Sequence, residues 1–417
     1  MTMVLEPVST VIFSKRLQVL KILPSFVITT SEAADRFFPA KAKDKSARTE
    51  IAISTEARIK SAFFIMRTLM AHFHEKNRIL IFPAAVFLLV FIISQTGCGK
   101  RTDLPVSGQD FCFDTVCTVT VYDIETGGHD EAEKLIDEVF ERCVTYEKLL
   151  SRTKEGSDVY RINHAGGEGV ICNDVTVDLI EIAIRYCALS GGDFDITVGG
   201  LTKQWDFRSD EPDVPSDENI KEAVKHVGFD NIVVSGNEVR LRDPLCEIDL
   251  GAVAKGYIAD RLTEFMEQRG VKSAVISLGG NIVCIGEKKD GRESGRFRIG
   301  IETPYSDQRK ISGVVAMSDE TAVTSGVYER FFEKDGKMYH HILDPKTGYP
   351  ADTDLLSVTV ISGKGRSADC DALATICVLK GADEGKRFLK GMTGYEGFFI
   401  DKNGVQYATD GFILEER

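Results

Sequence analysis

Short strand-like runs, divided by turn signals and interrupted by only a few amphipathic helices, constrain the fold of this 417-residue chain most. Helical apolar spacing is clear near 135–143, 175–190, 256–269 and 369–379. A strand is expected over 111–122, and the remainder of the chain after residue 270 alternates short strands with turn dipeptides such as Asp-Gly and Asn-Gly. This mixture predicts an α+β fold rather than a regular βαβ series.

Charge is unevenly distributed along the chain. Residues 1–97 are basic on balance, whereas residues 98–417 carry the acidic excess behind the formal net charge of -13. An acidic body repels polyanions, which argues against nucleic acid as a partner. Residues 109–417 are enough for one large body with a sizeable core.

An export signal precedes this body. The basic pair Lys76 and Arg78, followed by the uncharged run 79–93, has the layout of a secretory signal, and residues 95–98, which end in Gly97-Cys98, are similar to a lipobox. We therefore expect 66–97 to be a lipoprotein signal peptide and Cys98 to be lipidated, on the extracytoplasmic face of the cell membrane. The alternative is an uncleaved membrane anchor, for which this run is short because a span needs about 20 residues.

The segments on either side of the signal have simpler roles. Met66 or Met70 is a plausible true start, which leaves residues 1–65 as an unassigned N-terminal extension. Residues 98–108 read as a tether between the lipid anchor and the body. Nine further cysteines are scattered without a Cys-x-x-Cys pair, so they predict buried free thiols rather than a disulfide framework or a zinc site.

A carboxylate and a hydroxyl stand four residues apart in the last predicted helix. If 369–379 is helical, Asp371 and Thr375 project from one face. Such oxygens suit a hard cation like Mg²⁺, which is commonly held by few protein ligands plus the phosphates of a substrate. His341 lies earlier in the chain, beside an apolar run, and such a histidine is more often structural than catalytic.

Two glycine-containing turns allow close approach of a ligand. The turn 251–256 places Lys255 at the start of a predicted helix, where backbone N–H groups and an ammonium can meet a diphosphate. It is not a Walker motif, and the alternative is a surface lysine at an ordinary turn. Gly279-Gly280 follows a predicted strand and lets the backbone approach a ligand, although a plain hairpin turn explains it equally well.

Together these segments resemble the FAD:protein FMN transferase family, the ApbE-like flavin transferases, over about residues 110–415. Seven stretches match in the family's order: LSRT at 150–153 with 157–163, GDFDITVG at 192–199, DLGAVAKGY at 249–257, SLGGN at 277–281, TSG at 324–326, HILDPKTG at 341–348 and ADCDALAT at 368–375. Each stretch is weak alone, but seven in sequence are specific.

The resemblance implies one ApbE-like catalytic body, residues 109–417, that transfers FMN from FAD to a threonine hydroxyl of a partner protein with Mg²⁺ and releases AMP. The implied Mg²⁺ ligands are the backbone oxygen of Ala252 and the side chains of Asp371 and Thr375. His341 is implied near the reacting diphosphate as the catalytic residue. The implied FAD-binding residues are Phe113, Thr153, Asp193, Phe194, Asp195, Asp249, Lys255, Gly279 and Gly280.

Two positions depart from the family pattern, and both flank the flavin in the family. Its Met-Gly-Thr is Phe113-Asp114-Thr115 here, and its aromatic residue after the LSR run is Thr153. The implied acceptor is a flavin-bearing subunit of a membrane redox complex. Two rival functions stay open: an FAD diphosphatase that gives FMN and AMP, and a non-catalytic flavin-binding lipoprotein, against which the metal residues argue.

Overall fold

The computed structural model describes residues 104–290, 293–306 and 310–415, so the predicted signal peptide and Cys98 lie outside the described residues. The strands are β1 (Val106–Cys112), β2 (Thr115–Ile124), β3 (Val170–Ile171), β4 (Ile232–Ser235), β5 (Glu238–Leu241), β6 (Val271–Leu278), β7 (Asn281–Ile285), β8 (Lys288–Asp290), β9 (Glu293–Gly295), β10 (Phe297–Glu302), β11 (Ile311–Met317), β12 (Glu320–Gly326), β13 (Phe331–Lys334), β14 (Lys337–His340), β15 (Leu355–Gly363), β16 (Glu396–Asp401) and β17 (Gln406–Ala408). The helices are α4 (Gly128–Leu150), α5 (Asp158–Asn163), α6 (Asp174–Leu189), α7 (Gly199–Trp205), α8 (Asp217–Val224), the 3-10 turn η2 (Phe229–Asn231), α9 (Ala254–Gln268) and α10 (Ser367–Lys390). Within this described part, no helix combines the length and the apolar character needed to cross a bilayer.

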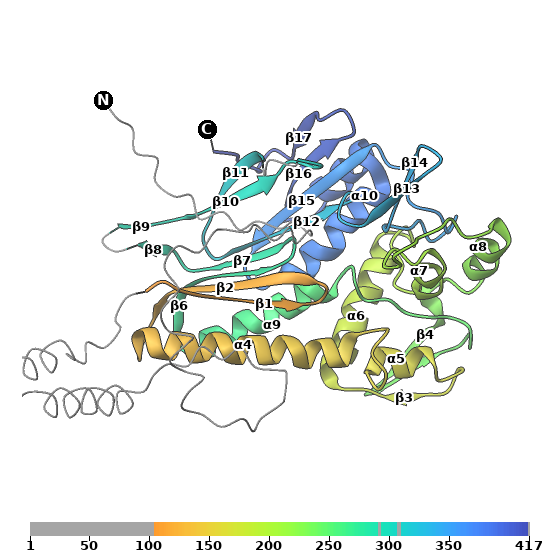
Figure 1. The fold of residues 1–417 in the computed structure, drawn as a ribbon, viewed down its shortest axis with the longest axis horizontal. Helices are drawn as coiled ribbons and strands as arrows, with labels where there is room; N and C mark the ends of the chain where they lie inside the picture. The colour runs from red at the N-terminus through yellow and green to blue at the C-terminus, as the bar shows by residue number, and fades with distance from the viewer. Residues whose placement is uncertain (1–103, 291–292, 307–309, 416–417) are drawn as a thin grey trace, which may run out of the picture. The chain divides into compact units, whose positions relative to one another are not determined.

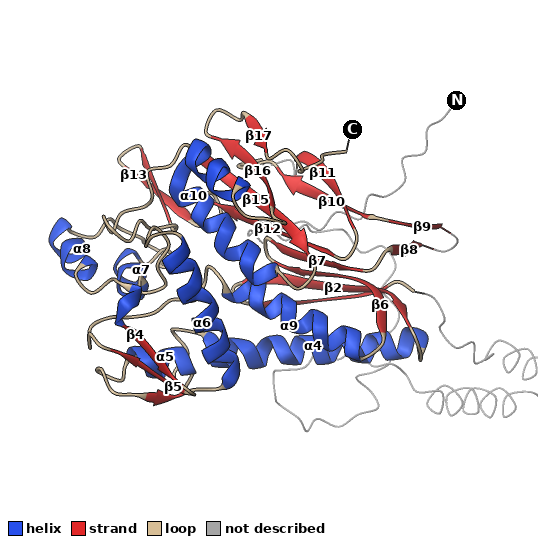
Figure 2. Cartoon of the chain, turned by 180° about the vertical axis from the view of Figure 1, so that it is seen from behind, coloured by secondary structure: helices blue, strands red, loops and turns tan. Residues whose placement is uncertain are grey.

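An antiparallel eight-stranded sheet forms the centre, in the order β1-β2-β6-β7-β12-β15-β16-β17 (Figure 1). Successive side chains of a strand point to opposite faces. Ile276 of β6 accordingly belongs to the main core with α4, α9 and α10, whereas its neighbour Val275 packs in a second core with β10 and β11. The three long helices therefore cover one face of the sheet (Figure 2), and the prediction of an α+β fold is confirmed.

The prediction of one strand over 111–122 is wrong, because a two-residue turn divides it. Phe113 and Asp114 both have positive φ, 54° and 58°, and connect β1 to β2 as a hairpin. A two-residue hairpin loop of this kind needs left-handed residues, which aspartate tolerates and phenylalanine rarely adopts. β1 begins at Val106, so the end of the range assigned to the tether is already part of the sheet.

The ends of several central strands meet the turns that connect them on one side of this sheet, across the strand direction. This end of the sheet is here called the site edge. Register pairs the start of β2 with the end of β6 through Cys117 and Leu278, and the start of β7 with β12 through Asn281 and Val323. The turns 113–114 and 279–280 and the segment after β12 therefore lie at the same edge. The nine cysteines of the described part are free and buried, as predicted.

Candidate functional site

Asp371 lies in the second turn of α10 and is buried. Its Oδ2 accepts the backbone N–H of Gly256 at 2.9 Å, and its Oδ1 lies 3.9 Å from Nζ of Lys255. A Cβ at Gly256 would stand 2.2 Å from the carbonyl oxygen of Ser367, so only glycine lets α9 and α10 approach this closely. Burial raises the pKa of Asp371, while Lys255 and the Gly256 N–H oppose that rise.

The oxygen groups near Asp371 fit a hard cation. Thr375 follows one turn later on α10, with its Oγ1 3.2 Å from Oγ of Ser325, and Ala252 lies in the turn just before α9. A buried carboxylate is costly to ionise unless a positive charge offsets the cost. Carboxylate, hydroxyl and carbonyl oxygens are also the donors that Mg²⁺ prefers. The residues present are therefore compatible with the predicted magnesium ion.

Lys255 links this metal-site candidate to two further segments of the site edge. Burial raises the pKa of Glu329, which follows β12, and lowers that of His341, which follows β14; the positive charge of Lys255 opposes the first shift and adds to the second. Together with the 3.9 Å approach to Asp371, these interactions bring residues from three distant stretches around one ammonium group. Lys255 is also in the first turn of α9, where backbone N–H groups favour an anion.

His341 has a defined tautomer. Its backbone N–H donates to the carbonyl oxygen of Arg330 at 3.0 Å, and Nδ1 lies 3.2 Å from the same oxygen. A carbonyl oxygen only accepts, so Nδ1 carries the proton and Nε2 keeps the lone pair. Burial, together with the Arg330 charge, lowers the pKa of His341 to about 3, so the ring is neutral at physiological pH.

The stretch that follows His341 is a tight turn held on both sides. Asp344 accepts the N–H of Gly348 on its carbonyl oxygen at 2.8 Å, and the indole N–H of Trp205 donates to the Gly348 carbonyl at 2.8 Å. Gly348 has a φ of 75°, and a Cβ there would meet Ile220 at 2.6 Å. The packing around Trp205 therefore fixes the turn beside the histidine.

Asp249 joins two of the matched stretches. Its Oδ1 accepts the N–H of Gly251 at 2.9 Å, and its Oδ2 lies 3.0 Å from Nε of Arg152. The Asn163 amide also exchanges two hydrogen bonds with the backbone of Ile248, at 2.8 and 2.9 Å. The segment after α4 is thus attached to the turn before α9. Thr153, the predicted flavin contact next to Arg152, is exposed.

The two-residue turns at the site edge approach one another. A Cβ at Gly279, which has a φ of 70°, would lie 3.2 Å from Cγ2 of Thr115 in β2. A Cβ at Gly280 would lie 2.7 Å from the Thr324 carbonyl and 3.6 Å from Oε1 of Glu329. The predicted residues Phe113, Gly279 and Gly280 are therefore neighbours of the segment that carries Glu329.

The three predicted residues 193–195 are used differently. Asp193 is partly exposed and pairs with Lys346 and Lys380, each at 2.5 Å. Phe194 is only 3% exposed and packs in the main core. The Asp195 carboxylate accepts the N–H and hydroxyl of Thr197, at 2.8 and 2.6 Å, and also the N–H of Phe229 at 2.8 Å. The side chains of Phe194 and Asp195 are therefore structural, and only their backbone atoms remain for the FAD contact predicted for them.

Glu329 is the site residue that sequence reasoning missed. It is exposed, yet protein atoms crowd its carboxylate and raise its pKa. The available signal was its position three residues after the matched TSG stretch.

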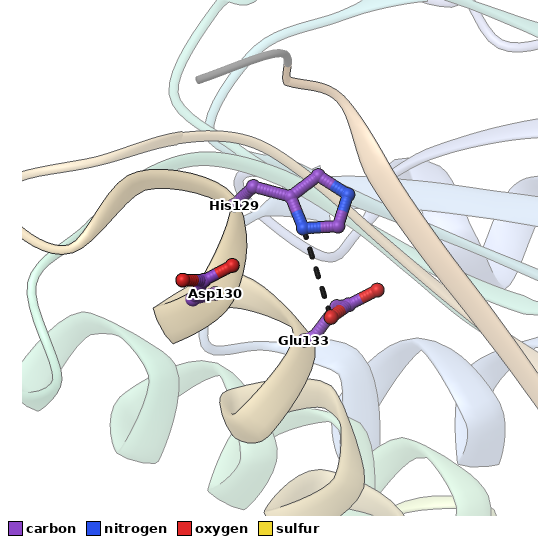
Figure 3. Close-up of side chains that lie close together, drawn as sticks. All are labelled: His129, Asp130 and Glu133. Atoms are coloured by element: carbon purple, nitrogen blue, oxygen red, sulfur yellow. Dashed lines mark ion pairs between the residues drawn. The ribbon is translucent and has the colours of Figure 1, made fainter. Parts of the chain in front are cut away.

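A second group of possible metal ligands lies elsewhere in the described part. His129, Asp130 and Glu133 all come from the first turns of α4, with Nδ1 of His129 3.7 Å from Oε2 of Glu133 (Figure 3). α4 has 23 residues, so its first turn is about 30 Å from the end that leads to Arg152. Two of the three side chains are exposed, and such clusters are common without a metal. This cluster is therefore separate from the site edge.

Known proteins resemble this chain in sequence over most of the described residues. The model of the ApbE family matches residues 113–399. A Treponema pallidum protein named FAD:protein FMN transferase is 34% identical over 78% of this chain and 93% of its own length. A Klebsiella pneumoniae protein of the same name is 36% identical over 66% of this chain and 84% of its own.

Solved structures show the same fold. The ApbE protein of Thermotoga maritima superposes with a TM-score of 0.67 at 29% identity, over 74% of this chain and 97% of that one. The flavinyl transferase ApbE of Pseudomonas stutzeri superposes with a TM-score of 0.64 at 28% identity, over 74% and 95%. Fold and relatives together define an enzyme of the transferase class. The chain belongs to the ApbE family.

Proposed function

We propose that this enzyme transfers FMN from FAD to a threonine hydroxyl of a partner protein, with Mg²⁺, and releases AMP. The observation that carries the proposal is the 3.9 Å approach of the Lys255 ammonium group to Asp371, with Glu329 and His341 close enough for the charge of Lys255 to act on them. The names of the relatives support flavin transfer as the reaction. The acceptor that the family resemblance implies, and that we propose, is a flavin-bearing subunit of a membrane redox complex.

The charges at the site edge suit a diphosphate substrate. Lys255 and the first backbone N–H groups of α9 bind the anion, and Gly279-Gly280 lets the main chain approach the flavin end. Asp371, Thr375 and the Ala252 carbonyl would hold Mg²⁺, which neutralises charge on the transferring phosphoryl group. His341, with its lone pair on Nε2, accepts a hydrogen bond from the incoming hydroxyl and orients it.

Incubation with FAD, Mg²⁺ and a candidate acceptor protein tests the reaction. We expect flavin fluorescence to remain on the denatured acceptor, with one AMP released for each flavin attached. The matched control is the same acceptor with its target threonine changed to valine, which removes the hydroxyl at nearly constant size. Release of FMN and AMP without labelled acceptor would identify a diphosphatase, and bound but unchanged FAD would identify a flavin-binding protein.

We also propose that the enzyme is anchored to the membrane through a lipid on Cys98, at the extracytoplasmic face. The support is the basic pair Lys76 and Arg78, the apolar run and the Gly97-Cys98 pair of the sequence. Expressed in a bacterium from Met66 or Met70, the wild type should fractionate with membranes and carry lipid, whereas Cys98→Ser should carry none. The measurement is mass spectrometry of the N-terminal peptide; an unmodified, unprocessed wild-type N-terminus contradicts the proposal.

A further inference from the structure

Glu329 is a carboxylate held locally by a hydrogen bond from the backbone of Gly326. It lies between β12 and β13, and its own N–H donates to the Gly326 carbonyl at 3.3 Å. Its side chain is exposed and forms no ion pair with another residue of the described ranges. Neighbouring carboxylates are engaged: Asp371 accepts the N–H of Gly256, and Asp249 is paired with Arg152.

The position of Glu329 places it within the site. Oε1 is 3.6 Å from where a Cβ on Gly280 would stand, so the side chain lies against the glycine turn of the site edge. Lys255, Arg330 and Asp371 are near enough for their charges to act on it. Arg330 in turn holds Nδ1 of His341 on its carbonyl oxygen. Glu329 is therefore adjacent to the residue whose backbone positions the histidine.

A transfer to a hydroxyl needs a group that receives a proton. His341 is a weak proton acceptor, because burial and Arg330 disfavour its charged form. The exposed carboxylate of Glu329 is accessible to an incoming side chain. Crowding by protein also makes it a stronger base than an ordinary surface carboxylate.

We propose that Glu329 receives the proton of the acceptor hydroxyl, with His341 orienting that hydroxyl. This inference rests on the proposed transfer of FMN. The hydroxyl oxygen forms a bond to the FMN-side phosphorus, and the bond from that phosphorus to the oxygen bridging it to AMP breaks. The electron pair of the broken bond leaves on AMP, and the proton passes to Glu329 and then to solvent.

Three variants test this assignment by single-turnover transfer to the acceptor protein, alongside FAD binding and thermal unfolding. Glu329→Gln keeps the size of the side chain and removes the base, so transfer should fall by about 10² or more while FAD affinity stays within about threefold. Glu329→Asp keeps a carboxylate and should retain more transfer than Glu329→Gln. The matched control is Glu333→Gln, at an exposed glutamate four residues on in β13, which should transfer like the wild type.

The possible outcomes separate this inference from the function on which it rests. A wild type that labels no acceptor contradicts the proposed function itself. If the wild type transfers normally, either Glu329→Gln with transfer within threefold of it or Glu329→Asp no better than Glu329→Gln overturns the role of Glu329. Parallel loss of FAD binding and transfer in Glu329→Gln assigns the residue to binding, and that result also overturns the proposal.

Discussion

Asp371→Ala should lower the rate of flavin transfer about a hundredfold or more, because loss of metal stabilisation at the transition state is worth several kcal/mol. The substitution removes the buried carboxylate that accepts the Gly256 N–H and lies 3.9 Å from Lys255. Chelation of Mg²⁺ with EDTA should silence the wild type as well. Single-turnover transfer, with and without added Mg²⁺, measures both effects.

A neighbouring aspartate on the same helix provides the control. Asp369 accepts the hydroxyl of Tyr395 at 2.7 Å and is not among the residues proposed to hold Mg²⁺. Asp369→Ala should therefore keep most of the transfer activity, even if thermal stability falls. Full turnover of the wild type in EDTA, or equal losses in both variants, would contradict a metal site at Asp371.

His341→Ala should lower acceptor modification by about 10²-fold, while FAD affinity changes only a few fold, because the incoming hydroxyl is no longer oriented. The reason is loss of Nε2, the lone pair that the hydrogen bond from Nδ1 to Arg330 leaves available. Burial and the Arg330 charge lower the pKa of His341 to about 3, so the wild-type rate should show no titration of this ring near pH 6.5. Stopped-flow measurement of the transfer rate across pH 5 to 8, on the wild type and on His341→Ala, tests the rate loss and the absence of a titration.

The adjacent histidine separates chemistry from structure. His340 is buried, with Nε2 3.2 Å from the Ala351 carbonyl, and burial lowers its pKa to about 4. His340→Ala should lower the melting temperature more than the intrinsic rate. A folded His341→Ala enzyme with normal transfer would eliminate His341 from the reaction, and a variant that loses stability, binding and transfer together would make it structural.

The sequence predicted the helices well because their apolar residues face one core. The spacing near 256–269 and 369–379 became α9 and α10, which pack on the same face of the sheet. The family resemblance assigned Asp371 of α10 and Lys255 of α9 to one site. In the structure Nζ of Lys255 lies 3.9 Å from Oδ1 of Asp371. Helical periodicity survives in the sequence because burial selects residue type at each position along the helix.

Other features depended on tertiary context and were missed. A phenylalanine in a left-handed turn contradicts local preference, so nothing in the 111–122 pattern indicated the hairpin at Phe113 and Asp114. The matched motif did not distinguish the two aspartates of the stretch. Asp193 forms ion pairs with two lysines, whereas the carboxylate of Asp195 accepts hydrogen bonds from the nearby Thr197. Glu329 could be assigned to the site only from the structure, in which the turn at Gly280 lies against the segment after β12.

The dispersal of the site over the chain has a consequence for how the protein matures. Phe113 belongs to the first hairpin, whereas Asp371 and Thr375 belong to α10, which packs against β12 and β15 near the end of the chain. Contacts between segments so distant in sequence form late, since the chain must first close the long loops between them. A nascent or threaded chain without α10 would thus lack both side chains that are proposed to hold Mg²⁺. We therefore expect FAD binding to be measurable only after the chain has folded completely.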